Sequence, residues 1–226
     1  MAKAVLEAAS VKAEEDVLLS AAARLFRERG FEGSSLRQIA RAAGMLPGSL
    51  YYRYRTKEAL LLALMRRGVE GMTTAIRRAV EGEIDPVERL RLGLRAHLRA
   101  LLLGDDAAYV LLYEWRSLGA EARREMIRLR DRYDAFWEGM LYEAAGCGRL
   151  RAGADLKLVR LLGFGAMNWT TQWYSSQGGR TPDEIADVFW GCMAFGLVNE
   201  ASRPENVDQA MRALGALEGP PRGRTA

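Results

Sequence analysis

The chain has 226 residues, 49% of them hydrophobic, so it is long and apolar enough to bury a core, which excludes a disordered protein. Its formal net charge of +4 is too small to indicate a nucleic-acid partner by itself. The first 13 residues contain no hydrophobic signal core, and the uncharged stretch 161–179 is too polar to span a bilayer. We therefore expect a cytoplasmic protein without a membrane segment.

Apolar residues recur at helical spacing almost throughout, and no stretch alternates at period two for long enough to indicate a sheet. Gly30 is expected to end a helix in the left-handed conformation. Asp85 and Thr181 each precede a proline and a glutamate at capping-box spacing. Helices are expected over residues 14–29, 36–43, 47–54, 57–80, 85–103, 105–118, 121–145, 155–176 and 182–200.

This pattern predicts an all-α protein with two domains. A three-helix head, residues 1–60, is expected to precede a larger helical body, residues 61–226. The last residues, about 203–226, lack core side chains and are expected to be frayed.

The segment 34–57 concentrates the positive charge of the chain, with five basic side chains and no acidic one. Gly44 separates two short helical patterns, and Leu36, Ile39 and Ala40 form an apolar stripe. A solvated basic helix pair is the alternative for a charge run alone. The turn glycine, the periodicity on both sides and the adjacent tyrosines together favour a helix-turn-helix for the major groove of DNA. Its basic residues are Arg37, Arg41, Arg53, Arg55 and Lys57.

The stretch from Val17 to Met65 resembles the DNA-binding head of the TetR family of transcriptional regulators. The matching pieces are AAARLFRERGF, the IA of the second helix, the AG turn, GSLYYRY and TKEALL. Leu46 departs from the family, which often has a small polar capping residue there, and Tyr54 stands where Phe is usual. The resemblance implies DNA contacts by Arg37, Pro47, Gly48, Ser49, Tyr51, Tyr52, Arg53 and Lys57.

These contacts divide into two kinds. Tyr51 and Lys57 are expected to anchor phosphates, since Lys57 opens a helix whose unpaired N–H groups also attract an anion. Base contacts are expected from Arg37, Ser49, Tyr52 and Arg53.

The resemblance further implies a ligand-responsive repressor that binds a palindromic double-stranded operator as a homodimer. In the family the last two long helices usually form a four-helix interface, which here corresponds to residues 155–176 and 182–200. Phe189, Trp190 and Phe195 leave the final helix apolar on more than one side, which fits a dimer helix. A helix buried within its own subunit would have the same composition.

The body contains aromatic residues with polar neighbours, as a mainly apolar pocket with a few orienting groups requires. Plain core packing is the alternative for each aromatic residue. The pocket residues expected are Tyr113, Trp115, Trp137, Asn168, Trp169, Gln172 and Trp173.

The segment GAMNWTTQWYSSQGGRTPDEIA resembles a subset of the family that responds to acyl-CoA thioesters and controls fatty-acid, aromatic-acid or steroid breakdown. This implies an acyl-CoA effector. A regulator of efflux that responds to drug-like or aromatic compounds is the alternative. The phosphates of a CoA ester would need an arginine-lined mouth, for which the candidates are Arg116, Arg123, Arg124 and Arg128.

No catalytic or metal-binding pattern occurs, since HExxH, Walker A, GxSxG and dinucleotide motifs are missing. His97 is alone, and Cys147 and Cys192 lie far apart without clustering, so we expect no metal, no cofactor and two buried thiols. An enzyme or lipid carrier, and a dimeric adaptor whose head binds protein, remain the competing function classes.

Overall fold

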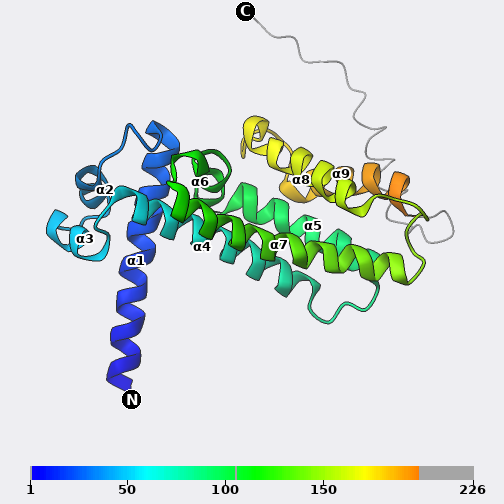
Figure 1. Ribbon diagram of the computed structural model, residues 1–226, viewed down its shortest axis with the longest axis horizontal. Helices are drawn as coiled ribbons and strands as arrows, with labels where there is room; N and C mark the ends of the chain where they lie inside the picture. The colour runs from blue at the N-terminus through cyan, green and yellow to red at the C-terminus, as the bar shows by residue number, and fades with distance from the viewer. Residues whose placement is uncertain (1, 105, 199–226) are drawn as a thin grey trace, which may run out of the picture. The chain divides into compact units, whose positions relative to one another are not determined.

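The computed structural model describes residues 2–104 and 106–198. Its regular elements are helices (Figure 1), apart from one isolated antiparallel bridge between Leu150 and Val198. The all-α prediction is therefore confirmed. The elements are α1 (Ala2–Arg29), α2 (Leu36–Ala42), α3 (Pro47–Arg53), α4 (Lys57–Val80), α5 (Pro86–Leu103), α6 (Ala107–Tyr113), the 3₁₀ helix η1 (Trp115–Ser117), α7 (Ala120–Gly146), α8 (Leu156–Trp173) and α9 (Pro182–Leu197).

The helices form two compact units. Among the described residues, unit 1 comprises 2–74, 103–104 and 106–134, and unit 2 comprises 75–102 and 135–198. The three boundaries between them fall inside α4, before the last residue of α5, and inside α7. The predicted domains, 1–60 and 61–226, are defined by DNA binding and by ligand binding with dimerisation. A division by packing does not test them, so they stay a prediction. The predicted frayed tail, 203–226, lies outside the described residues.

Four of the expected helices differ from those in the structure by more than two residues. α8 and α9 end at Trp173 and Leu197, three residues before the expected ends at 176 and 200. α1 begins at Ala2 instead of residue 14, because the extra residues are mostly strong helix formers such as Ala, Glu and Lys. The single helix expected over 105–118 is α6 followed by η1, with the change at Glu114. Gly119 then donates its N–H to the Glu58 carboxylate of α4 over 2.6 Å, which turns the chain before α7.

Helix ends follow the local sequence with one exception. Gly30 has φ +72°, and Ser35 and Thr181 form complete capping boxes with Gln38 and Glu184. Asp85 caps α5 through the N–H groups of Val87 and Glu88. The predicted capping role of Glu88 is wrong, because the Asp85 N–H donates to Glu83 while the Glu88 carboxylate accepts from Arg91.

The start of α3 lacks a side-chain cap, as the sequence predicts. Leu46 occupies the N-cap position with an extended backbone, makes no capping hydrogen bond, and is 77% exposed. Leu46→Ser should therefore raise the free energy of unfolding by about 1 kcal/mol, since it adds an acceptor and removes almost no buried surface. Urea unfolding of both proteins measures this. Leu46→Ala is the control, and an equal gain from alanine would contradict the capping explanation.

In unit 1, α2 packs on α1 and α3 packs on α2, and α6 also contacts α1 (Figure 1). Phe31 packs on Phe26 at the end of α1, with ring centroids 5.6 Å apart. On α1, Leu18, Ala21 and Leu25 are buried, whereas Val17 is exposed.

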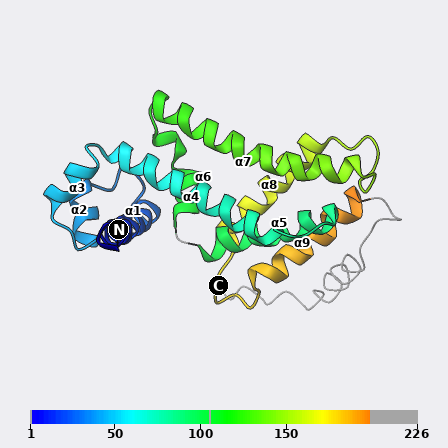
Figure 2. The same ribbon diagram turned by 90° about the horizontal axis from the view of Figure 1, so that it is seen from below.

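In unit 2, α5, the second half of α7, α8 and α9 share a core (Figure 2). Gly163 of α8 lies so close to α9 that an added Cβ would meet Met193 Cε at 3.3 Å. His97 is 1% exposed, so it is part of this core. The two cysteines are both exposed, so the prediction of buried thiols is wrong. Cys147 follows the end of α7, and Cys192 lies on the outer face of α9.

Candidate functional site

The helix pair α2–α3 presents one buried and one open side. Ile39 and Leu50 are fully buried, and Gly44 makes the turn between the helices with φ +67°. Tyr52 is 90% exposed, and Pro47, Gly48, Ser49 and Tyr51 are exposed with it. Because Gly48 and Ser49 are small, the backbone of α3 can approach a partner closely, and the tyrosine hydroxyls can reach further out.

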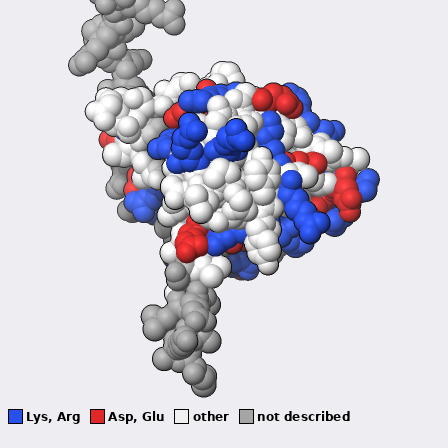
Figure 3. Space-filling model, turned by 90° about the vertical axis from the view of Figure 1, so that its left-hand side faces the viewer, with Lys and Arg blue, Asp and Glu red and all other residues white. Residues whose placement is uncertain are grey.

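The basic side chains of this segment fall into two groups. Arg37, Arg41 and Arg55 are exposed and form no ion pair with the side chains that the structure describes. Arg53 and Lys57 are held by other parts of unit 1. On this end of the molecule, Lys and Arg side chains gather around an uncharged area, with acidic side chains among and beside them (Figure 3).

Lys57 links the loop before α2 to the start of α4. Its ammonium donates to the carbonyls of Phe31 and Ser34 over 2.6 and 3.0 Å, and lies 4.1 Å from the Phe31 ring centroid. The Glu32 carboxylate is 3.9 Å away. A stabilising role within the head is therefore evident for Lys57, whereas its predicted phosphate contact stays a prediction.

The sequence suggested that the Arg53 side chain is free to contact DNA, but in the structure it is paired with α1. Its Nη2 lies 2.5 Å from Glu14 Oε2 of α1. The next residue, Tyr54, donates its hydroxyl to Glu15 of the same helix. Sequence periodicity missed these partners because they come from a part of α1 that lies far away along the chain.

Unit 2 contains a small apolar cavity of about 40 Å³, which has room for roughly one water molecule. One charged side chain borders it: Arg160, which is only 7% exposed and pairs with Glu138 over 3.1 Å. The Nε1 of Trp190, also in the wall, is buried and has no hydrogen-bond partner among the described residues. The lining residues are Leu90, Leu94, Trp137, Leu141, Val159, Arg160, Gly163, Phe164, Met167, Trp190, Met193 and Leu197.

Models of known families match both parts of the chain. Residues 18–64 match the bacterial regulatory proteins of the tetR family, and residues 83–197 match the tetracyclin repressor-like C-terminal domain. The chain belongs to the TetR family. Its members are DNA-binding regulators and not enzymes, so it is a transcriptional regulator whose helix-turn-helix is α2–α3.

This TetR protein is similar over most of its length to named regulators and to a solved structure. The repressor KstR2 of Mycobacterium tuberculosis is 27% identical over 196 residues, which cover 85% of this chain and 97% of that protein. The fatty acid metabolism regulator of Bacillus subtilis is 27% identical over 158 residues, covering 69% and 81%. The crystal structure of AibR in complex with isovaleryl coenzyme A and operator DNA superposes with TM-score 0.71 at 29% identity, covering 81% of this chain and 97% of AibR.

The effector residues expected from sequence are divided between the two units of this TetR protein. Tyr113 and Trp115 belong to unit 1, where Tyr113 packs on Tyr109 and Trp115 on the guanidinium groups of Arg116 and Arg123. The other five belong to unit 2.

Of the five in unit 2, Trp137 lines the cavity, and Asn168 hydrogen-bonds to buried His97. Trp169, Gln172 and Trp173 are exposed on α8. Sequence analysis missed Arg160, although its spacing of three and seven residues from inward-facing Gly163 and Met167 could have indicated it.

One face of α8 is apolar and exposed along its whole length. It comprises Leu158, Leu161, Leu162, Gly165, Ala166, Trp169 and Trp173. Cys192, Phe195 and Gly196 form a similar exposed stripe on α9. Adding a Cβ at Gly165 or Gly196 would meet no atom within 4 Å, so nothing in the described chain covers these positions. Such a face marks an interaction surface.

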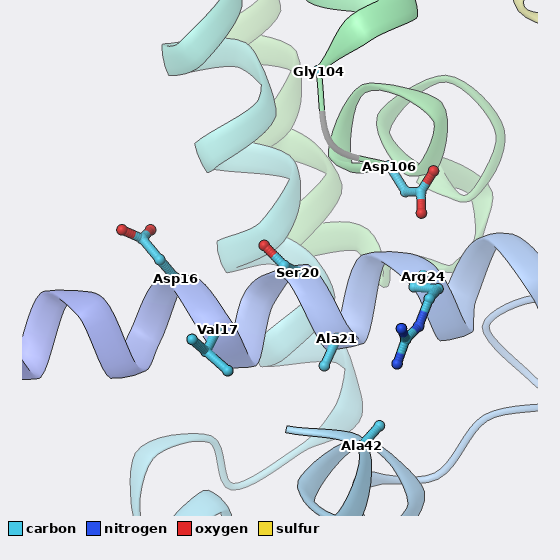
Figure 4. Close-up of a pocket in the computed structure, with 8 residues that line it drawn as sticks. All are labelled: Asp16, Val17, Ser20, Ala21, Arg24, Ala42, Gly104 and Asp106. Carbon is cyan, nitrogen blue, oxygen red and sulfur yellow. The ribbon is translucent and has the colours of Figure 1, made fainter. Parts of the chain in front are cut away.

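A second concavity, of about 620 Å³, lies within unit 1 beside α1 (Figure 4). Its wall is mixed, with the carboxylates of Asp16 and Asp106 and the guanidinium of Arg24. None of the predicted effector residues lines it. Elsewhere in the described residues, no group of His, Cys, Asp and Glu could hold a metal ion, and no helix is long and apolar enough to cross a membrane.

The lowered pKa of buried His97 predicts how the free energy of unfolding depends on pH. Burial lowers its pKa to about 4, against a hydrogen bond with Asn168 that raises it. The unfolded chain takes up this proton near pH 6.5, and the folded protein only near 4, so stability should fall between these values as pH decreases, by about 1.4 kcal/mol per pH unit. Urea unfolding at several pH values, for wild type and His97→Gln, isolates this contribution. Parallel curves for the two proteins would contradict it.

Proposed function

We propose that this regulator is a repressor that binds a palindromic operator as a homodimer and is released by a small hydrophobic effector, an acyl-CoA thioester. The observation that carries the DNA-binding part is the open side of the helix pair, where Tyr52 of α3 is 90% exposed. Arg37 and Arg41 of α2 are exposed as well and form no ion pair with the side chains that the structure describes. Arginine donors suit phosphates and guanine edges, and small residues allow close approach.

The homodimer is supported by the uncovered apolar face of α8 and α9. The exposed leucines and tryptophans of α8 would be buried by a second copy, and Gly165 and Gly196 would allow the helices to approach closely. A two-fold dimer presents two copies of α3 to a palindrome, with half-sites about 34 Å apart.

The acyl-CoA effector is supported by relatives and by the charge of the unit 2 cavity. AibR binds isovaleryl coenzyme A, and the B. subtilis relative is named for fatty acid metabolism. The cavity wall is apolar, its single charge is the cation of Arg160, and the indole N–H of Trp190 can donate to an acyl carbonyl. Arg160 is itself paired with Glu138, so the wall offers a ligand mainly apolar surface and the donor of Trp190.

The cavity must enlarge to admit an acyl group. Met167 and Met193 are unbranched side chains that can change rotamer at low cost, and they line the wall on α8 and α9. Binding can release DNA only if the effector prefers the DNA-incompetent conformation.

Selection of operators from a random duplex library tests the DNA-binding proposal. We expect inverted half-sites and an affinity that falls steeply with salt. Arg37→Ala should weaken binding by at least about tenfold, as the loss of a base or phosphate contact does. Arg78→Ala, an exposed arginine of unit 2, is the charge-matched control. Equal affinities for these two variants would reject α3 and its neighbours as the DNA-reading surface.

Titration of the operator complex with acyl-CoA esters of increasing chain length tests the effector. Free CoA, the free acids and a cationic dye serve as controls. At least one ester should lower operator affinity by about tenfold or more, within the range of known allosteric couplings. Unchanged affinity at saturation with every ester would reject the acyl-CoA proposal.

A further inference from the structure

The basic segment 34–57 contains no acidic residue in sequence, yet the fold places an acidic run beside it. Glu14, Glu15 and Asp16 follow one another on α1. Glu14 pairs with Arg53 over 2.5 Å, and Glu15 accepts the hydroxyl of Tyr54. Two of these three acids of α1, Glu14 and Glu15, therefore contact the end of the helix-turn-helix.

The third acid has a different partner. Asp16 Oδ1 lies 3.6 Å from Arg67 Nη1, and Arg67 also donates to the Asp16 carbonyl over 3.1 Å and to Ser20 Oγ over 2.9 Å. Arg67 lies on α4, outside the predicted DNA contacts. The run thus contains one acid that holds a predicted DNA contact and, two positions on, one that does not.

The exposure and hydrogen bonding of the Arg53 guanidinium determine whether it can leave Glu14 for another acceptor. The Arg53 side chain is 25% exposed, and its second terminal nitrogen, Nη1, is buried without a hydrogen-bond partner among the described residues. Glu14 is 56% exposed, so its carboxylate can rotate into solvent at low cost. Turning the guanidinium outward would free Nη1 for a new acceptor while breaking one exposed ion pair.

We propose that Glu14 competes with a DNA phosphate for the Arg53 guanidinium, so that α1 limits the affinity of the head for its operator. The inference rests on the proposed DNA-binding function. A phosphate can accept from both terminal nitrogens of Arg53, whereas Glu14 engages one of them. The Glu14 carboxylate also repels the phosphate backbone, so both effects lower affinity while Glu14 is charged.

Glu15 and Tyr54 have a positioning role beside this competition. Burial, together with the hydrogen bond to Glu15, raises the pKa of Tyr54 well above its usual value, so the hydroxyl stays protonated and keeps donating. This contact holds the residue after α3 against α1, and thereby keeps Arg53 within reach of Glu14.

A double-mutant cycle on the full-length protein tests the competition. Glu14→Gln should bind the selected operator about fivefold more tightly at low salt, the upper end of what an exposed ion pair contributes. Asp16→Asn removes the same charge two residues away and should change affinity by less than about twofold, because the ion pair that it breaks involves Arg67 and not Arg53. In an Arg53→Ala background, Glu14→Gln should lose most of its effect. Circular dichroism and thermal unfolding establish that each variant is folded.

Two results would overturn the inference while leaving the proposed function intact. One is an equal gain from Glu14→Gln and Asp16→Asn, which would indicate a general charge effect. The other is a gain from Glu14→Gln that persists without Arg53. If wild type and all variants bind no duplex from the library, the proposed function and the inference both fail.

Discussion

Leu162→Glu should convert the protein into a monomer and reduce its affinity for a two-half-site operator by at least about 100-fold, because linked binding of two heads is lost. Leu162 is 65% exposed in the single chain, so the substitution removes little packing within the subunit. In the proposed dimer, two glutamates would be buried against an apolar helix face, which is strongly unfavourable. Sedimentation equilibrium and operator titration measure the two effects.

The matched control for this variant is Leu103→Glu. Leu103 is 62% exposed at the end of α5, so it introduces the same charge at a leucine of similar exposure outside α8 and α9. It should leave the oligomeric state unchanged. A Leu162→Glu protein that remains dimeric would show that subunits associate through another surface.

Glu138→Ala should lower the free energy of unfolding by about 2–3 kcal/mol, because it removes a carboxylate that faces a buried guanidinium. Arg160 is 7% exposed and pairs with Glu138 over 3.1 Å, while Glu138 itself is 36% exposed. Because Glu138 is partly exposed, the expected loss of stability is at the lower end of the range for breaking a buried ion pair. Urea unfolding measures the loss.

Two further variants separate a buried charge from general loss of an ion pair. Glu143 lies on α7, as Glu138 does, and pairs with Arg89 of α5. Glu143→Ala should cost about 1 kcal/mol or less, since both partners are partly exposed. Adding Arg160→Met to Glu138→Ala should restore stability, because the uncompensated charge is then gone. No recovery in the double variant would mean that Arg160 stabilises unit 2 mainly through its packing.

Much of the fold could be predicted because its signals are local. Helical periodicity placed α2, α3, α4 and α5 within a residue or two, and Gly30, Ser35 and Thr181 end or begin helices through contacts three or four residues away. The missing cap at Leu46 was predictable for the same reason. The single helix expected over 105–118 was wrong, because the structure changes from α6 to the 3₁₀ helix η1 at Glu114.

The open side of the helix-turn-helix was also predictable, since a short amphipathic helix has one buried stripe and Tyr52 lies opposite it. The partners of its basic residues were not. Arg53 and Lys57 looked equivalent to Arg37 in sequence, but the fold gives Arg53 a carboxylate from α1 and gives Lys57 two backbone carbonyls.

The effector region depended still more on tertiary structure. Aromatic composition predicted a pocket, but it could not distinguish Trp137, which lines a cavity, from Trp169 and Trp173, which lie on an exposed face. Local sequence determines which helices form and where they end, because those interactions span a few residues. Which side of each helix is buried, and which acid meets Arg53 or Arg160, depends on contacts between distant segments, so only packing decides it.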